Sequence, residues 1–150
     1  MTLAFGSTVA AVCFALMILG AGFYEVLVVD PSWPERPEII QPQHGGISRA
    51  RFWMPAHTLL ELSVIVAVIA AWTNREVRLW LFAALISHLV TRTWSFMDFI
   101  PKAIAFERAE PKSITVGSAR RWTQRSRFRL PLEMVTCGAM IGALVRLVRG

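Results

Sequence analysis

The chain has 150 residues, of which 55% are hydrophobic and only 17% are charged, and its formal net charge is +6. Soluble domains carry about a quarter charged residues, so this composition favours a membrane protein over a soluble one. The basic residues lie between hydrophobic stretches, where the electrostatics of a bilayer account for them, and this argues against nucleic-acid binding. The length predicts one domain, residues 1–150.

The first hydrophobic stretch, residues 3–29, is expected to cross the bilayer, which takes about 20 apolar residues in a helix. The stretch is about twice as long as the apolar part of a signal peptide, and no basic segment precedes it. We therefore expect it to remain in the mature protein. The sequence Asp30-Pro31 marks its end, because Pro stops a helix.

Three further spans follow in the sequence, at residues 53–72, 77–100 and 130–148. Tryptophans bracket the second span, and Pro101 marks the end of the third. The connection at residues 73–76 is too short for anything except a helical hairpin. Because helices satisfy their own backbone hydrogen bonds in lipid, the expected fold is an all-α integral membrane four-helix bundle with antiparallel up-down spans.

Two longer connections, residues 31–52 and 102–129, are expected on the same side of this bundle. The first is rich in Pro, and the second begins with a possible helical continuation at 103–109 and then becomes strongly basic. Most of the Lys and Arg residues fall in these two connections, so the positive-inside rule places both long loops in the cytoplasm. Small residues in the first and fourth spans permit close helix contacts, within one chain or in a homo-oligomer.

Ionisable residues within the four spans are the candidates for function, because a charged group at such depth costs about 2.5–3.5 kcal/mol. At a rise of ~1.5 Å per residue, all of them fall in the half of the bilayer next to the long loops. His57 and Glu61 are four residues apart, as are His88 and Arg92, so each pair shares one helix face. This predicts an internal polar pocket open towards the loops. The candidates are Glu25, His57, Glu61, His88, Arg92, Asp98 and Glu133.

Two kinds of chemistry suit this set. In the first, His57 binds non-haem iron or haem, with His88 as a second cofactor ligand. In the second, His57 acts as a base supported by Glu61, Arg92 stabilises an oxyanion or enolate, and Glu25 shapes the pocket. Proton translocation is disfavoured, because the outer half of the bundle is almost wholly apolar.

Structural explanations remain open for the same residues. Glu25, Asp98 and Glu133 lie near helix ends, where a carboxylate reaches the interface. Arg92 would then only neutralise a nearby carboxylate. On this reading the chain is a non-catalytic small membrane subunit or scaffold of a larger complex. His44, in the first long connection, is either a solvated loop residue or part of a lid.

Three short tracts resemble the anthrone-oxygenase-like group of small four-span membrane proteins. They are residues 21–25 (Ala-Gly-Phe-Tyr-Glu), residues 51–57 (Arg-Phe-Trp-Met-Pro-Ala-His) and residues 92–101 (Arg-Thr-Trp-Ser-Phe-Met-Asp-Phe-Ile-Pro). The group includes cofactor-independent oxygenases of polycyclic aromatic substrates. The resemblance implies oxygenation of a lipophilic small molecule within the bilayer.

A weaker resemblance is to styrene oxide isomerase, another small four-span membrane protein. In that family a His that follows an aromatic- and Arg-containing tract at the start of the second span ligates haem b, and the ferric iron opens an epoxide as a Lewis acid. His57, preceded by Arg51 and Trp53, matches that placement. This resemblance implies isomerisation with haem bound to His57. The sequence thus predicts a membrane-embedded oxidoreductase or isomerase.

Overall fold

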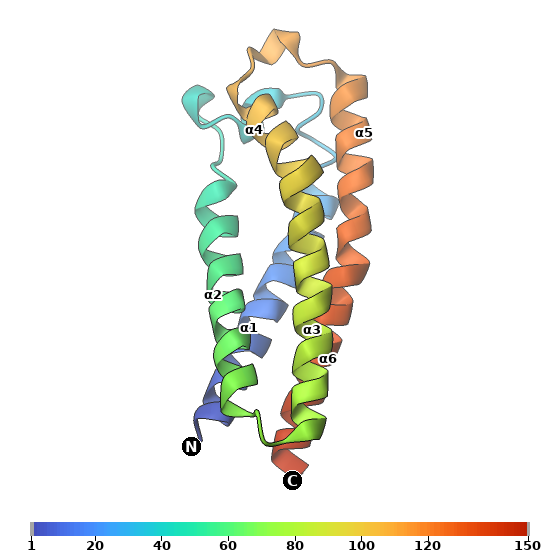
Figure 1. Ribbon diagram of the computed structural model, residues 1–150. Helices are drawn as coiled ribbons and strands as arrows, with labels where there is room; N and C mark the ends of the chain where they lie inside the picture. The colour runs from blue at the N-terminus through green and yellow to red at the C-terminus, as the bar shows by residue number, and fades with distance from the viewer. Residues whose placement is uncertain (1, 150) are drawn as a thin grey trace.

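The computed structural model describes residues 2–149, and this part of the chain is helical and contains no strand. Figure 1 shows four long helical columns side by side, with the two chain ends and the short α2–α3 turn at one end and the long connections at the other. The helices are α1 (Leu3–Tyr24), α2 (Ala50–Ala70), α3 (Arg75–Trp94), α4 (Ile100–Arg108), α5 (Val116–Ser126) and α6 (Leu130–Arg149).

Two of the columns contain a π-helical turn. The turn Glu25–Val29 extends α1, and the turn Ser95–Phe99 joins α3 to α4. The expectation that the third span ends at Pro101 is therefore wrong, because the helix continues through it to Arg108. The Ile100 amide donates to the Ser95 carbonyl, which shifts the hydrogen-bond pattern one residue before Pro101. Pro101 then occupies the first turn of α4, where the missing N–H does little harm.

The other helix ends lie close to their expected positions. The first column ends at Val29, as expected, and α6 covers Leu130–Arg149 against the expected 130–148. The α2 helix begins at Ala50 rather than at residue 53, because the amides of Phe52 and Trp53 donate to the Arg49 carbonyl. The Asn74 side chain caps the start of α3 by accepting from the Val77 amide at 3.2 Å.

Small and branched side chains fill the space between the columns, whereas large apolar side chains cover the outside. Ala11, Val64 and Leu81 are fully buried. On the outer faces Leu62, Ile69 and Ile86 are exposed, together with many other large hydrophobic side chains. An apolar exterior of this extent is what a lipid-facing surface requires.

Three helical segments are long and apolar enough to cross a membrane: Leu3–Val29, Ala50–Ala70 and Val116–Arg149. This finding is consistent with a membrane protein. The third expected span, residues 77–100, is helical but is not among the three. Its polar residues, which include His88 and Arg92, lower its hydropathy.

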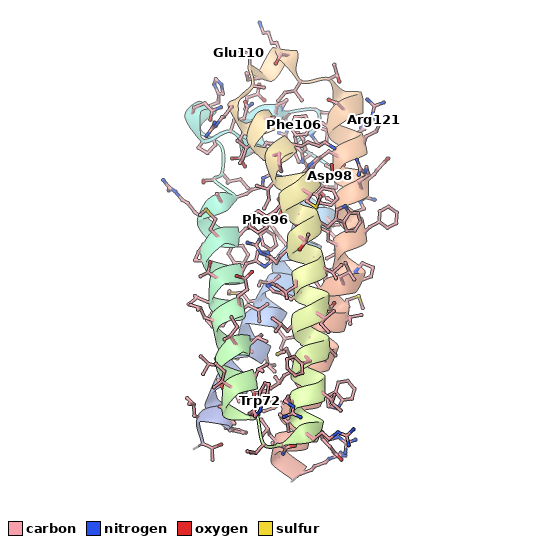
Figure 2. The ribbon with its side chains drawn as sticks, viewed as in Figure 1. Trp72, Phe96, Asp98, Phe106, Glu110 and Arg121 are labelled. Carbon is pink, nitrogen blue, oxygen red and sulfur yellow. The ribbon has the colours of Figure 1, made fainter. Side chains whose placement is uncertain are left out.

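The two connections expected as loops pack together into a cap over one end of the columns. Residues 31–49 contain two 3-10 turns, Pro37–Ile40 and Pro42–His44, and the second connection contains α4 and α5. Only the helical continuation at 103–109 had been expected there. Trp33, Ile40, Phe99 and Trp122 form an apolar core inside the cap. Figure 2 shows Phe106 and Arg121 at the level of this cap and Trp72 at the opposite end.

A buried glutamine fastens the first connection to the second. Gln41 is fully buried, and its side-chain amide donates to the carbonyls of Phe106 and Ala109, each at 2.8 Å. Gly46 passes so close to this turn that an added Cβ would lie 2.0 Å from the Glu38 carbonyl oxygen. The cap is thus held by specific polar and backbone contacts as well as by its aromatic core.

Candidate functional site

A cavity of about 520 Å³ lies where the four columns meet the cap. Its wall receives residues from the ends of α1 and α3, the starts of α2 and α6, and both α4 and α5. The lining includes apolar side chains, among them Val26, Met54, Phe96, Ile100 and Ile104. It also includes ionisable groups, among them Glu25, Arg49, His57, Arg92, Arg129 and Glu133.

Both π-helical turns border this cavity. Glu25 and Val26 belong to the turn that ends the first column, and Ser95, Phe96 and Phe99 belong to the turn below α4. Turns of this type cost hydrogen-bond geometry and are frequent at functional sites. Here they redirect the side chains of two columns towards the same space.

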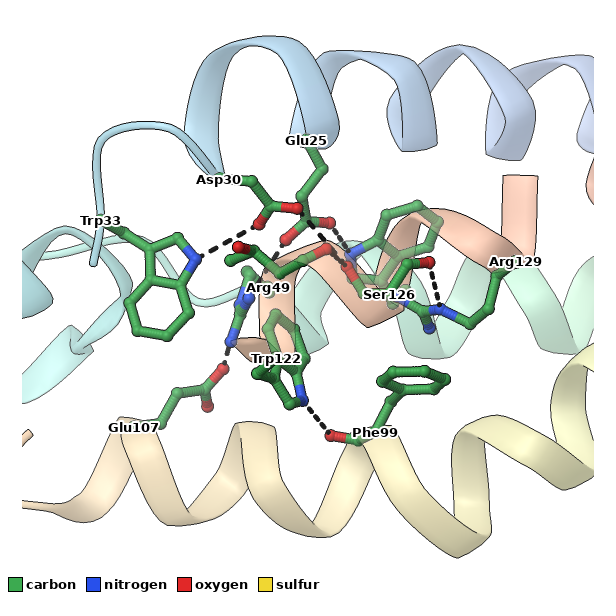
Figure 3. A network of polar contacts seen from close by, with 11 residues as sticks. Glu25, Asp30, Trp33, Arg49, Phe99, Glu107, Trp122, Ser126 and Arg129 are labelled. Carbon is green, nitrogen blue, oxygen red and sulfur yellow. Dashed lines mark hydrogen bonds and ion pairs between the residues drawn. The ribbon is translucent and has the colours of Figure 1, made fainter. Parts of the chain in front are cut away.

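A chain of polar contacts crosses the loop-side end of the cavity and joins α1, α2 and α4. Trp53 Nε1 donates to Glu25 Oε2 at 2.9 Å, and Arg49 Nη1 lies 3.3 Å from Glu25 Oε1. Arg49 Nε lies 3.5 Å from Glu107 Oε1 (Figure 3). The Arg49 guanidinium also lies over the rings of Trp122 and Trp33, at 5.2 and 5.9 Å from their centroids. We call Glu25, Arg49, Trp53 and Glu107 the loop-side cluster.

Asp30 extends these contacts towards α5. Trp33 Nε1 donates to Asp30 Oδ1 at 3.2 Å, and Ser126 Oγ lies 3.5 Å from Asp30 Oδ2 (Figure 3). Burial, together with the nearby Glu25 carboxylate, raises the pKa of Asp30 from 3.8 to about 6, against the lowering effects of the Trp33 hydrogen bond and of the charges of Arg49 and Arg129. Asp30 therefore titrates close to neutral pH.

A second group of polar residues lies deeper, within α2 and α3. The His57 ring stacks on Trp53, with centroids 5.6 Å apart, and its other neighbour is the His88 ring at 5.4 Å. His88 Nε2 lies 3.4 Å from Glu61 Oε1, and Arg92 Nε donates to the same oxygen at 3.0 Å. We call His57, Glu61, His88 and Arg92 the mid-helix cluster. Trp53 connects it to the loop-side cluster, because its indole contacts both Glu25 and His57.

Three residues of the cavity wall carry a buried polar atom without a hydrogen-bond partner within residues 2–149. These atoms are Arg49 Nη2, His57 Nδ1 and Glu133 Oε2. The large majority of buried side-chain polar atoms are hydrogen-bonded, so three exceptions around one cavity require an explanation. Three of the five side chains that carry such an atom within residues 2–149 thus belong to the cavity wall.

The structure brings together only part of the predicted set. Glu25, His57, Arg92 and Glu133 line the cavity. Glu61 and His88 do not; they lie beside His57 and Arg92, outside the lining.

Two other candidates lie away from the cavity. Asp98 pairs with Lys102 and with Arg125 instead of lining it. His44 is exposed on the cap, and it too is absent from the lining.

Sequence reasoning missed Arg49, Asp30, Trp122 and Arg129 as parts of the site. Arg49 and Arg129 had been counted only as loop charges. Arg129 Nη1 donates to Ser95 Oγ at 3.2 Å and so ties the start of the last column to the π-helical turn of the third. The available signal was the presence of tryptophans in two otherwise polar connections, which favours a packed structure over open loops.

The donor set bears on which cofactor the cavity fits. No three of the His, Cys, Asp and Glu side chains between residues 2 and 149 lie together as ligands of one metal ion. Haem needs only one imidazole from the protein, and His57 lines the cavity. Within residues 2–149 the lining thus offers a single imidazole and no three-ligand group for one iron ion.

Comparisons with protein-family models, curated proteins and solved structures find no match to this chain.

Proposed function

We propose that this chain is a membrane-embedded enzyme that acts on a lipophilic small molecule by oxygenation or isomerisation. We further infer four antiparallel spans, with the cap on the cytoplasmic side where the positive-inside rule puts it. The observation that carries the proposal is the cavity, whose wall combines apolar side chains with the ionisable residues Glu25, Arg49, His57, Arg92, Arg129 and Glu133.

The lining indicates a lipophilic substrate. Met54 on α2, Phe96 on the π-helical turn and Ile104 on α4 line the cavity and are 68%, 56% and 42% exposed. We infer that the cavity opens between these apolar side chains towards the bilayer. A molecule dissolved in the bilayer would then reach the polar groups without crossing water.

The ionisable residues of the lining support acid–base chemistry with His57 as the base. A neutral imidazole needs no charged partner at this depth, and its unprotonated nitrogen can accept a proton from the substrate while the resulting substrate anion balances the new charge. Arg92 and Arg129 also line the cavity and supply positive charge for an enolate or oxyanion formed when the substrate loses its proton. Reaction of such an anion with O₂ would give oxygenation of an activated aromatic substrate. Glu61 does not contact His57 directly and would act on it only through His88.

A haem-dependent alternative uses the same residue. His57 would hold the haem, which would supply Lewis acidity for opening an epoxide. The rings of Trp53 and His88 lie against the imidazole and would fix its orientation. Both versions place His57 at the centre of the reaction.

Turnover measurements on the protein purified in detergent test the proposal. Anthrone and styrene oxide are the first substrates, because the two resemblances imply a polycyclic aromatic compound and an epoxide. We expect product from one of them and a loss of at least about a hundredfold in His57→Ala, since general acid–base catalysis contributes about 10²–10⁴-fold. His44→Ala is the matched control, because His44 is exposed and lies outside the cavity lining.

The absorption spectrum and iron content of the same preparation separate the two chemistries. A colourless, iron-free and fully active protein would remove the haem version. Full activity in His57→Ala would remove both versions, because each depends on His57. Absence of turnover by the unaltered protein with either substrate would favour the non-catalytic membrane subunit.

A further inference from the structure

A second cleft, of about 420 Å³, lies between α4 and α5 on the outer side of the cap. Phe99 and Trp122 separate it from the cavity, since both residues line the two spaces. Its other walls carry Lys102 from α4 and Arg121 and Arg125 from α5. The cleft is thus a basic site distinct from the proposed catalytic one.

The charges around this cleft are only partly compensated. Asp98 is shared, with Lys102 on one carboxylate oxygen and Arg125 Nη2 at 2.6 Å on the other. Arg121 is exposed and makes no ion pair within residues 2–149. Three cations and one carboxylate leave the cleft with positive charge for an anion to neutralise.

The floor and the surroundings of the cleft are apolar. Phe99, Phe106 and Trp122 line it beneath the three cations. Figure 2 shows Asp98 on the column below Phe106 and Arg121, where the helices leave the apolar part of the molecule and enter the cap. In a membrane protein this is the depth of the lipid headgroups.

We propose that the cleft between α4 and α5 binds the phosphate headgroup of an anionic phospholipid. Lys102, Arg121 and Arg125 hold the phosphate, and the apolar part of the lipid packs on Phe99, Phe106 and Trp122. Basic pockets between helices at the headgroup level recognise anionic lipids in this way. A soluble phosphate would use the cations but not the aromatic lining, so the arrangement favours the lipid. The inference does not depend on the proposed enzymatic activity.

Lipid binding to the purified protein, measured by native mass spectrometry, tests this site. Dioleoyl phosphatidylglycerol is expected to bind, and Arg121→Gln is expected to weaken its binding about fivefold. The double variant Lys102→Gln/Arg121→Gln should weaken it further. Arg120→Gln is the matched control: it removes the same charge from the adjacent position of α5, but Arg120 pairs with Glu35 and lies outside the cleft. This control is expected to bind like the unaltered protein.

Three results would overturn the proposal. Equal binding of dioleoyl phosphatidylcholine would show that no anionic headgroup is recognised. Competition by glycerol 3-phosphate at the lipid's own concentration would show a site for soluble phosphates instead. An equal effect of Arg120→Gln and Arg121→Gln would show general charge attraction to the cap. Melting temperatures of the variants identify any loss of folding, which is not expected at two exposed positions.

Discussion

Arg49 provides the sharpest test of how the cap is held to the helices. Its guanidinium lies between Glu25 and Glu107 and over the rings of Trp33 and Trp122, and its side chain is only 7% exposed. Arg49→Gln would leave both carboxylates without this cation. Breaking a buried ion pair by removing one partner costs about 3–5 kcal/mol, and the lost contacts with the two indoles add to this.

For a chain of this size, 1 kcal/mol corresponds to about 2–4 °C in melting temperature, so Arg49→Gln is expected to lower it by about 6–20 °C. Tryptophan fluorescence during heating in detergent measures this, because Trp33 and Trp122 are buried in the cap. Arg51→Gln is the control: Arg51 is exposed two residues away, and its loss should change the melting temperature by less than about 2 °C.

The reasoning would be refuted if Arg49→Gln, like the Arg51→Gln control, changed the melting temperature of the protein by less than about 2 °C. Arg49 would then not connect the cap to α1 and α4 in solution. Arg49→Lys refines the measurement, because it keeps the charge but loses the planar fork that reaches both carboxylates. An intermediate loss is expected from it.

Three more predictions test separate parts of the fold. For Asp30, the difference between a pKa of 3.8 and about 6 corresponds to about 3 kcal/mol of stability. This stability is present below pH 4 and is lost as the pH rises through 6. Melting curves from pH 4 to 8 should show the fall, and Asp30→Asn should abolish it. Gly142→Ala would put a Cβ 2.8 Å from the Trp80 ring and should lower the free energy of unfolding by about 1–3 kcal/mol in denaturant titrations. In the control Gly138→Ala the Cβ meets nothing within 4 Å, so this variant should be as stable as the unaltered protein or more stable. Gly46→Ala, whose Cβ would collide with backbone, should open the cap to limited proteolysis; unchanged cleavage would contradict the close turn.

The helical columns could be predicted from the sequence because their signals are local. A long apolar run and a following Pro define the column that ends at Val29, and the Asn74 cap lies in the short turn before α3. The position of the polar residues at the loop-side end also followed from counting along each helix. Glu25, His57 and Arg92 reach one cavity for this reason.

The cap could not be predicted in the same way, because its contacts join residues far apart in the chain. The buried ring of Trp122 contacts Trp33, whose centroid lies 5.9 Å away, and nothing local to either residue indicates this partner. Likewise, the π-helical turn Ser95–Phe99 allows the helix to continue through Pro101, a residue that usually ends a helix. Helix-face spacing placed Glu61 with His57, but the contacts of Glu61 are on α3, with His88 and Arg92.

The central claim is that the reaction takes place inside the cavity, and kcat/KM of a cavity-filling variant tests it most directly. Ala103 lines the cavity, so Ala103→Phe would place a phenyl ring in the space for the substrate. Ala83 is exposed on the outer face of α3 and lies outside the lining, which makes Ala83→Phe the matched control. We predict that Ala103→Phe lowers kcat/KM by at least about tenfold, equivalent to ~1.4 kcal/mol of transition-state stabilisation, while Ala83→Phe stays within about twofold. Equal values for the two variants would contradict the account.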